Sequence, residues 1–343
     1  MRMRRSRRGA ASPGLAERLL YGRPMRLRYL VAFALPAAAI ASLSTVHRSQ
    51  GTTPADDASR ARCAARLSLA LTGKAPDAEL LAAGDPQSQI DALLASDAFV
   101  ETFSRFINSQ LNPEPADTPA GDAAYYLAKY VLQNNRPWHE LFDGPYDVQP
   151  VAAANGMPAT AQVVSDPNGL GYFRSRPWMV RYAGNEEQGY RLSAAFRIQQ
   201  NIIGLDVGAV TNAPGVDISA SGRMAAGCRG CHYDPYFALD KVAKILSRKS
   251  GTAPNLTFTP PSEGPQQLLD GRMIANDGEL VKALVESTDH KFRTCRLAFQ
   301  FLYGRSEANC EAALFDRCID AYTATGDVRA ALKSIASDQS FCE

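Results

Sequence analysis

The sequence of 343 residues lacks the marks of several functional classes. It has no serine–histidine–acid spacing, no glycine loop of the kind that cradles phosphates, and no cluster of carboxylates. Strand-like alternation of apolar and polar residues is scarce. The only dense positive run lies in residues 1–28, which hold nine arginines and one acid; the chain total of +2 less the +8 of this segment leaves −6 for the rest. A strongly basic nucleic-acid binder is therefore excluded for the body of the protein.

An export signal is predicted near the N-terminus. From Met25, two arginines precede an apolar run over 29–43, and small residues within it supply a cleavage site of the A-x-A kind. This run is shorter than the roughly 20 residues that span a bilayer, and no other stretch approaches that length. We expect cleavage near Ala41 and a periplasmic or secreted mature chain without a transmembrane span. Translation starts at Met1 or at Met25, and an uncleaved anchor is the alternative to cleavage.

Helix signals dominate the remaining sequence. In 97–111, four apolar residues at i, i+4, i+7 and i+8 spacing share one face, and the C-terminal segments read as helix hairpins with short connections, as in bundles. The sequence predicts a mostly α fold with long irregular loops, and residues 143–178 are expected to form such a loop. Helices are expected over 60–71, 88–94, 97–111, 122–132, 188–203, 237–246, 292–303, 309–322 and 328–336, with a further helix after Asp277.

The chain is expected to divide into five parts. An N-terminal extension with the signal peptide occupies 1–41, and a polar linker occupies 42–59. Bundle-like helical domains are expected over 60–205 and 277–343, on either side of a distinct segment over 206–276.

The five residues Cys228-Arg-Gly-Cys-His232 form the C-x-x-C-H attachment motif of c-type haem. Two thiols three positions apart lie on one side of a single turn, so both can bond to the two vinyl groups on one edge of a porphyrin. The next residue then lies under the ring and can donate an imidazole nitrogen to the iron. Gly230 keeps the turn free of bulk. We therefore expect one covalently attached haem c, held by Cys228 and Cys231, with His232 as an iron ligand.

Two other uses of the motif remain open. A Cys228–Cys231 disulfide, redox-active or inert, is one, and half of a zinc site with two further ligands is the other. Removing these two cysteines leaves five, so at most two disulfides form and one thiol is left over. Cys310 and Cys318 lie eight positions apart and cannot bridge within an unbroken helix. We expect Cys63 to be the unpaired one.

Met273 is the leading candidate for the second iron ligand. It lies 41 residues after His232 in a loop before a helix, where small c-type cytochromes place a distal methionine. A methionine would raise the reduction potential relative to a second histidine. His290 is expected to be exposed between two helices. The other candidates are Met224, Met179, His139 and His290, or an open or water-bound iron.

Five stretches resemble the motifs of one group of exported proteins. They are residues 66–76 (RLSLALTGKAP), 90–97 (IDALLASD), 135–142 (NRPWHELF), 228–235 (CRGCHYDP) and 280–305, which ends in FLYGR and holds Cys295. In these stretches the sequence resembles the cytochrome-C-like domain families of planctomycetes and myxobacteria, which are largely of unknown function. The resemblance implies an exported, helical, haem-linked protein, with Cys228 and Cys231 as the attachment points and His232 as the proximal ligand.

Three hypotheses for function follow. The first is an exported c-type cytochrome-like protein with a single haem, which transfers electrons to an unknown redox partner without further substrate chemistry. The second is a haem-free structural or binding module of the cell envelope, stapled by disulfides. The third is a haem peroxidase, which needs an open distal side that carries a base.

Overall fold

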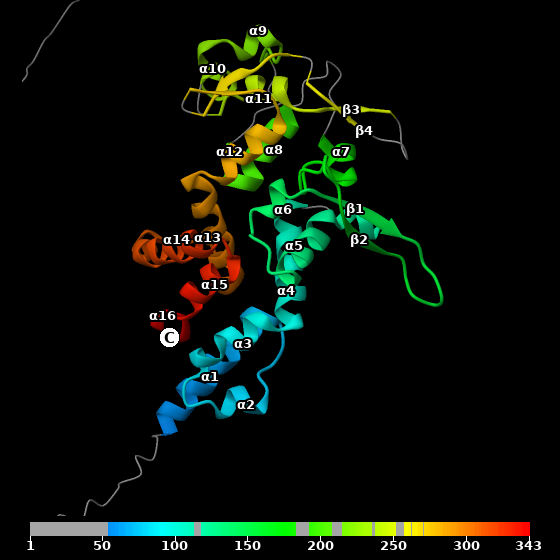
Figure 1. Ribbon diagram of the computed structural model, residues 1–343. Coiled ribbons are helices and arrows are strands. Elements are labelled where there is room, and N and C mark those ends of the chain that lie inside the picture. The colour runs from blue at the N-terminus through cyan, green and yellow to red at the C-terminus, as the bar shows by residue number, and fades with distance from the viewer. Residues whose placement is uncertain are drawn as a thin grey trace, which may run out of the picture. The chain divides into compact units, whose positions relative to one another are not determined.

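The computed structural model describes residues 54–112, 118–182, 192–207, 215–234, 237–251, 257–261, 263–269 and 271–343. The expected signal peptide and the cleavage near Ala41 lie outside these residues. The chain from Thr52 to Glu343 forms one compact unit. Within the described ranges this unit holds 16 α-helices and three two-stranded hairpins, which confirms the mostly α fold (Figure 1). None of the described helices is long and apolar enough to span a bilayer.

The first helical layer is built around α4 (Asp97–Leu111), which packs against α1 (Pro54–Thr72) and α5 (Ala123–Gln133). The side chain of Ser96 caps α4 by accepting from the Phe99 N–H. Phe103 lies on the expected apolar face, is fully buried, and contacts the rings of Trp138 and of Phe301 in the C-terminal half. The expected linker over 42–59 is too long, because α1 begins at Pro54.

The C-terminal helices are α12 (Asp277–Val285), α13 (Thr288–Tyr303), α14 (Ala312–Thr325), α15 (Val328–Ala336) and α16 (Gln339–Cys342). α13, α14 and α15 pack against one another, as expected for helix hairpins with short connections. Gly304 and Gly326 end α13 and α14 at φ +65° and +68°, a left-handed conformation that glycine adopts without cost. Asp327 then caps α15 by accepting from the Arg329 N–H. The turn chemistry of the sequence therefore predicts these ends correctly.

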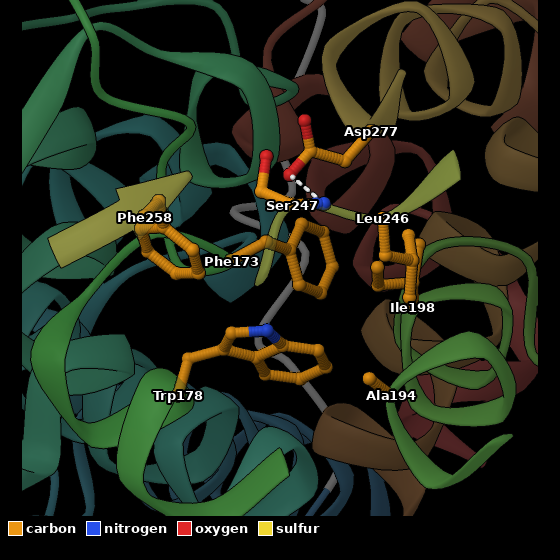
Figure 2. Close-up of a pocket in the computed structure, with 8 residues that line it drawn as sticks. All are labelled: Phe173, Trp178, Ala194, Ile198, Leu246, Ser247, Phe258 and Asp277. Atoms are coloured by element: carbon orange, nitrogen blue, oxygen red, sulfur yellow. Dashed lines mark hydrogen bonds between the residues drawn. The ribbon is translucent and has the colours of Figure 1, made fainter. Parts of the chain in front are cut away.

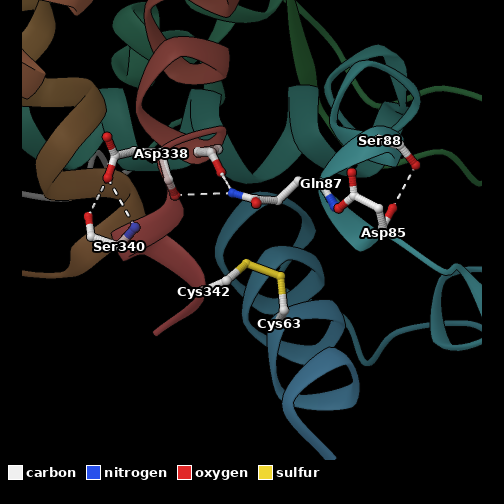
Figure 3. Close-up of a disulfide and its surroundings, with 8 residues drawn as sticks. Cys63, Asp85, Gln87, Ser88, Asp338, Ser340 and Cys342 are labelled. Carbon is white, nitrogen blue, oxygen red and sulfur yellow. Dashed lines mark hydrogen bonds between the residues drawn. A yellow bond between two sulfur atoms is a disulfide. The ribbon is translucent and has the colours of Figure 1, made fainter. Parts of the chain in front are cut away.

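The N-terminal and C-terminal helices are connected by contacts between residues that are far apart in the sequence. A disulfide joins Cys63 of α1 to Cys342 of α16, and the Gln87 amide donates to the carbonyls of Ala336 and Asp338 beside it (Figure 3). A second disulfide joins Cys295 of α13 to Cys318 of α14. The division into separate domains at 205/206 and 276/277 stays a prediction.

The unpaired cysteine was expected to be Cys63, and this is wrong. Cys63 is bonded to Cys342, and the exposed Cys310 is the thiol left over once Cys228 and Cys231 are set aside. The sequence could not show this pairing, because only the packing of α16 against α1 brings the two sulfurs together. The conclusion that at most two disulfides form among these five cysteines is confirmed.

Residues 143–178 are not one continuous loop. They contain the antiparallel hairpin of β1 (Tyr146–Val151) and β2 (Thr160–Ser165), in which Val148 is paired with Val163. Two shorter hairpins follow later in the chain. They pair β3 (Arg248–Ser250) with β4 (Thr257–Thr259), and β5 (Gln266–Leu268) with β6 (Arg272–Ile274).

The other helices are short, apart from α8. Three of them, α9, α10 and α11, contain or flank the cysteine motif. α8 begins, within the described residues, at Leu192, and α11 at Leu239. The remaining elements are α2 (Ala78–Ala82), α3 (Ile90–Ala95), α6 (Glu140–Asp143), α7 (Arg176–Tyr182), α8 (Leu192–Ile203), α9 (Ala220–Arg223), α10 (Ala226–His232) and α11 (Leu239–Ile245), with 3-10 turns over Pro86–Gln89, Pro119–Asp122 and Asn309–Glu311.

Candidate functional site

The cysteine motif forms the short helix α10. The N–H groups of Cys228 and Arg229 both donate to the Ala225 carbonyl at 2.9 Å, which starts the helix. Cys228, Cys231 and His232 are spaced i, i+3 and i+4, so their side chains lie on one face. No residue of α10 is buried, and both thiols are half-buried. The motif therefore presents two thiols and an imidazole on a helix that does not belong to the core.

The two thiols of the motif are not bonded to each other. The structure therefore does not contain the Cys228–Cys231 disulfide that was one alternative. No group of three or more cysteine, histidine or acidic side chains in the described ranges is arranged to hold a metal ion. The zinc alternative needs two further ligands beside this motif, and the described residues do not supply them.

The imidazole of His232 is held by a buried carboxylate. Its Nδ1 lies 2.7 Å from Oδ2 of Asp240, which is 1% exposed and lies on α11. A carboxylate accepts only, so Nδ1 donates its proton, and in the neutral imidazole Nε2 is the nitrogen that has the lone pair. No hydrogen-bond partner for Nε2 is found in the described part of the chain. This arrangement leaves one defined nitrogen of His232 for a metal or a proton.

Asp240 is also the centre of a larger hydrogen-bonded cluster. The Arg223 guanidinium donates to both carboxylate oxygens, with Nε 3.1 and 3.0 Å away and Nη2 2.8 Å from Oδ1. The Tyr233 hydroxyl donates to Oδ1 at 3.2 Å. A buried carboxylate is costly unless it is paired and hydrogen-bonded, and this one is paired with a buried guanidinium. The cluster thus fixes α9, α10 and α11 to one another.

The turn before α9 positions the side chain of Arg223 for its contact with Asp240. The Asp217 carboxylate accepts from the Ser219 N–H at 2.9 Å, and hydrogen bonds from Ser219 hold the pKa of Asp217 below its ordinary value. Ser219 in turn caps α9 by accepting from the Gly222 N–H. A Cβ at Gly222 would collide with the Asp217 carbonyl, so only glycine fits there. The Arg223 guanidinium also donates to the Ile218 carbonyl, which ties the turn to the cluster.

Asp240 reaches His232 because of the conformation at the start of α11. Ala238, the residue before α11, has φ +43° in the left-handed region and is fully buried. α11 packs against α8 and β5, and the Gln199 amide of α8 donates to the Phe237 carbonyl at 3.0 Å. The carboxylate is therefore held by the core, whereas the motif that it contacts lies outside it.

The surroundings of α10 are open. A Cβ built on Gly227 or Gly230 meets no atom of the described residues within 4 Å. The protein itself gives no steric reason for a glycine at position 230, although the sequence suggested one. Among the described residues, eight large apolar side chains are exposed, and half of them come from residues 206–276, which contain the motif. These four are Val216, Ile218, Met224 and Met273.

Met273 lies on β6, paired with Gln267 of β5, and is 61% exposed. β5 packs against α11, the helix that carries Asp240. The β5–β6 hairpin with Met273 and the carboxylate that contacts His232 are therefore connected through α11. The role of Met273 as second iron ligand stays a prediction. Met224 is 58% exposed at the end of α9, whereas Met179 is buried in the core.

His290 and His139, the two other histidine candidates for the second iron ligand, each make hydrogen bonds within the protein. His290 was expected to be exposed, and this is wrong, because it is 1% exposed between α8, α13 and α14. Its Nδ1 donates to the Ile202 carbonyl at 3.1 Å, and the Tyr322 hydroxyl lies 3.2 Å from Nε2. His139 is paired with Asp143 at 2.8 Å, and this hydrogen bond raises the pKa of His139.

A small internal cavity lies elsewhere, where Phe173 and Trp178 face α8 and the carboxylate of Asp277 (Figure 2). Its volume is ≈ 10 Å³, which is room for about one water molecule. The Asp277 carboxylate accepts from Arg174 at 2.7 Å and from the Ser247 N–H at 3.4 Å. The cavity is too small for an organic cofactor, and its charged groups are already paired.

Sequence reasoning missed Arg223 and Asp240, which precede and follow the motif. No spacing rule connects an arginine five residues before the first cysteine to an aspartate eight residues after the histidine. Neither a known protein family, nor a curated protein, nor a solved structure matches this chain.

Proposed function

We propose that this protein is an exported c-type cytochrome-like protein, with a single haem attached to Cys228 and Cys231 and coordinated by His232. It belongs to the periplasm or to the secreted fraction and transfers electrons to a partner protein. The single observation that carries the proposal is the arrangement of α10: two thiols not bonded to each other lie on the same face as an imidazole whose Nδ1 is already engaged.

The donor set fits a covalently held haem. Cys228 and Cys231 would form the two thioether links, and His232 would offer Nε2, since Asp240 holds Nδ1. A haem iron takes at most two axial ligands from the protein, so it does not need a cluster of three or more metal-binding side chains. Such a haem supplies one-electron transfer between the ferrous and ferric states.

The free space beside α10 also supports the proposal. Gly227 and Gly230 carry no side chains, and a Cβ built on either one meets no described atom within 4 Å. Exposed apolar side chains are unfavourable in water, and their number is high in this segment, at Val216, Ile218 and Met224. A porphyrin is a large apolar surface that such side chains would cover.

The two disulfides support the compartment that the proposal requires. Cys63–Cys342 and Cys295–Cys318 are both compatible with an oxidising environment, where disulfides persist. Covalent haem attachment takes place after export, so the predicted signal peptide and the disulfides are consistent with the same location. The partner that receives the electron is a protein still to be identified.

The test is the intact mass of the full chain, expressed for export in a host with haem-attachment machinery. We expect an increment of one haem, a haem absorption spectrum that survives denaturation, and loss of residues up to about Ala41. The double variant Cys228→Ser/Cys231→Ser should lose the increment. The matched control Cys310→Ser removes the remaining free cysteine, which is exposed, and should keep it.

The opposite result is equally clear. A colourless protein with an unmodified mass, or with a Cys228–Cys231 disulfide, would overturn the haem proposal. The two observed disulfides would then favour the second candidate, a haem-free module of the cell envelope.

A further inference from the structure

We infer that Asp240 is a positioning residue, which fixes the orientation of His232 and lowers the reduction potential of the haem. The inference rests on the proposed function and deepens it, because it assigns to this chain a device that tunes the same site. It starts from the contact between His232 Nδ1 and Asp240 Oδ2, at 2.7 Å.

The protein core holds one partner of this contact in place. His232 is on a helix that has no buried residue, whereas Asp240 is almost completely buried on α11, which packs against α8 and β5. The imidazole is 22% exposed, and the carboxylate is the only hydrogen-bond partner of its ring in the described residues. The orientation of the imidazole plane is therefore determined by a group that the core holds still.

The charge of the carboxylate gives the direction of the effect on the potential. A carboxylate that accepts the Nδ1 proton increases the electron density of the imidazole and so makes Nε2 a stronger donor. A stronger donor stabilises the ferric state more than the ferrous state, because the ferric iron carries the additional positive charge. A neutral acceptor at the same place would have a smaller effect, so loss of the negative charge should raise the potential.

Arg223 and Tyr233 limit this effect. The guanidinium donates to both oxygens of Asp240, and the Tyr233 hydroxyl donates to Oδ1, so both withdraw electron density from the carboxylate. Removing the hydroxyl alone should make the carboxylate a better acceptor for His232. Asp240 and Tyr233 therefore act on the potential in opposite directions, which a merely structural cluster would not do.

The experiment measures the midpoint potential of the haem-loaded full chain by spectroelectrochemical titration, with the haem per chain determined on the denatured protein. Asp240→Asn keeps the size and an acceptor oxygen but removes the charge. We expect it to change the ratio of reduced to oxidised protein at a fixed potential at least tenfold toward the reduced form, which is ~59 mV for one electron. Tyr233→Phe should lower the potential, and Asp240→Glu, which restores the negative charge, should have a potential closer to the original value than that of Asp240→Asn.

Asp240→Asn leaves Arg223 buried without a counter-charge and could fail to fold for that reason. The double variant Arg223→Gln/Asp240→Asn removes both charges and keeps hydrogen bonding, and its potential is compared with that of Arg223→Gln alone, so that the two differ only in the charge at position 240. An Asp240→Asn variant with the original potential, or a double variant with the potential of Arg223→Gln, overturns the role of Asp240 and leaves the proposed function intact. An unaltered chain without haem overturns the proposed function itself, and this inference with it.

Discussion

Cys63 in the first described helix and Cys342, the penultimate residue, are joined by a disulfide that spans 279 positions of sequence. The link therefore closes nearly the whole described chain into one loop. Since a disulfide stabilises mainly by limiting the freedom of the unfolded chain, a loop of this length should give an effect at the upper end of the range.

We expect Cys63→Ala/Cys342→Ala to lower the free energy of unfolding by up to about 5 kcal/mol, as the chain-entropy estimate gives for loops of more than 100 residues. Urea unfolding followed by circular dichroism measures it. Cys310→Ser is the matched control, since this thiol is exposed and unpaired, and it should cost less than about 0.5 kcal/mol. Equal stabilities for the double variant and the original chain would mean that packing alone holds α16 against α1.

The sequence predicted the elements with local signals and missed those that depend on distant contacts. Helices α4 and α15 have their caps and their apolar faces within one short window, so periodicity was sufficient. The β1–β2 hairpin is an exception, because a local signal for it lies in Asn155-Gly156. Asn155 and Gly156 have φ of +51° and +77°, the conformation that an Asn-Gly hairpin turn requires.

The site was predictable only in part, for the same reason. Cys228, Cys231 and His232 are recognised as a motif because their chemistry depends on spacing within one helix. The contact of His232 with Asp240 depends on the positive φ of Ala238 and on the packing of α11 against α8. Neither of these leaves a pattern in the sequence.

His290 should make the stability of the fold depend on pH. Burial lowers the pKa of His290 to about 4, from an ordinary value of 6.5. The unfolded chain therefore binds the proton more readily than the folded one. The contribution is fully present above pH 6.5 and is lost as the pH falls toward 4. Between about pH 8 and about pH 5 the loss should reach about 2 kcal/mol.

Urea unfolding at the two pH values, for the original chain and for His290→Gln, measures this dependence. The variant should lose less stability on acidification than the original chain does. His139→Gln is the control, because pairing with Asp143 raises the pKa of His139 and gives it the opposite pH dependence. An identical acid loss in the original chain and in His290→Gln would show that other groups cause it.

Two glycines near the cysteine motif should respond differently to alanine. At Gly222 a Cβ would collide with the Asp217 carbonyl, whereas at Gly230 it meets no described atom within 4 Å. Gly222→Ala must therefore open the turn that aims Arg223 at Asp240, and we expect a loss of about 1–3 kcal/mol of stability.

Gly230→Ala should leave the free energy of unfolding unchanged or raise it by up to about 1 kcal/mol, since alanine is more favourable than glycine in a helix. Thermal unfolding of both variants, prepared without haem, separates the two positions. Similar melting temperatures for Gly222→Ala and Gly230→Ala would contradict the turn geometry before α9.

Arg329 should contribute more to stability than an arginine in an exposed ion pair. Its guanidinium donates to the Leu94 carbonyl at 3.1 Å and to the Leu132 carbonyl at 3.0 Å, and so attaches α15 to the ends of α3 and α5. Arg329→Met keeps the apolar stem and removes these bonds, and we expect it to cost about 2 kcal/mol. Arg317→Met is the control, because Arg317 pairs with Asp338 at an exposed position, where such a pair contributes about 1 kcal/mol or less. If urea unfolding gave the two variants the same free energy, the carbonyl contacts of Arg329 would not hold the N-terminal and C-terminal helices together.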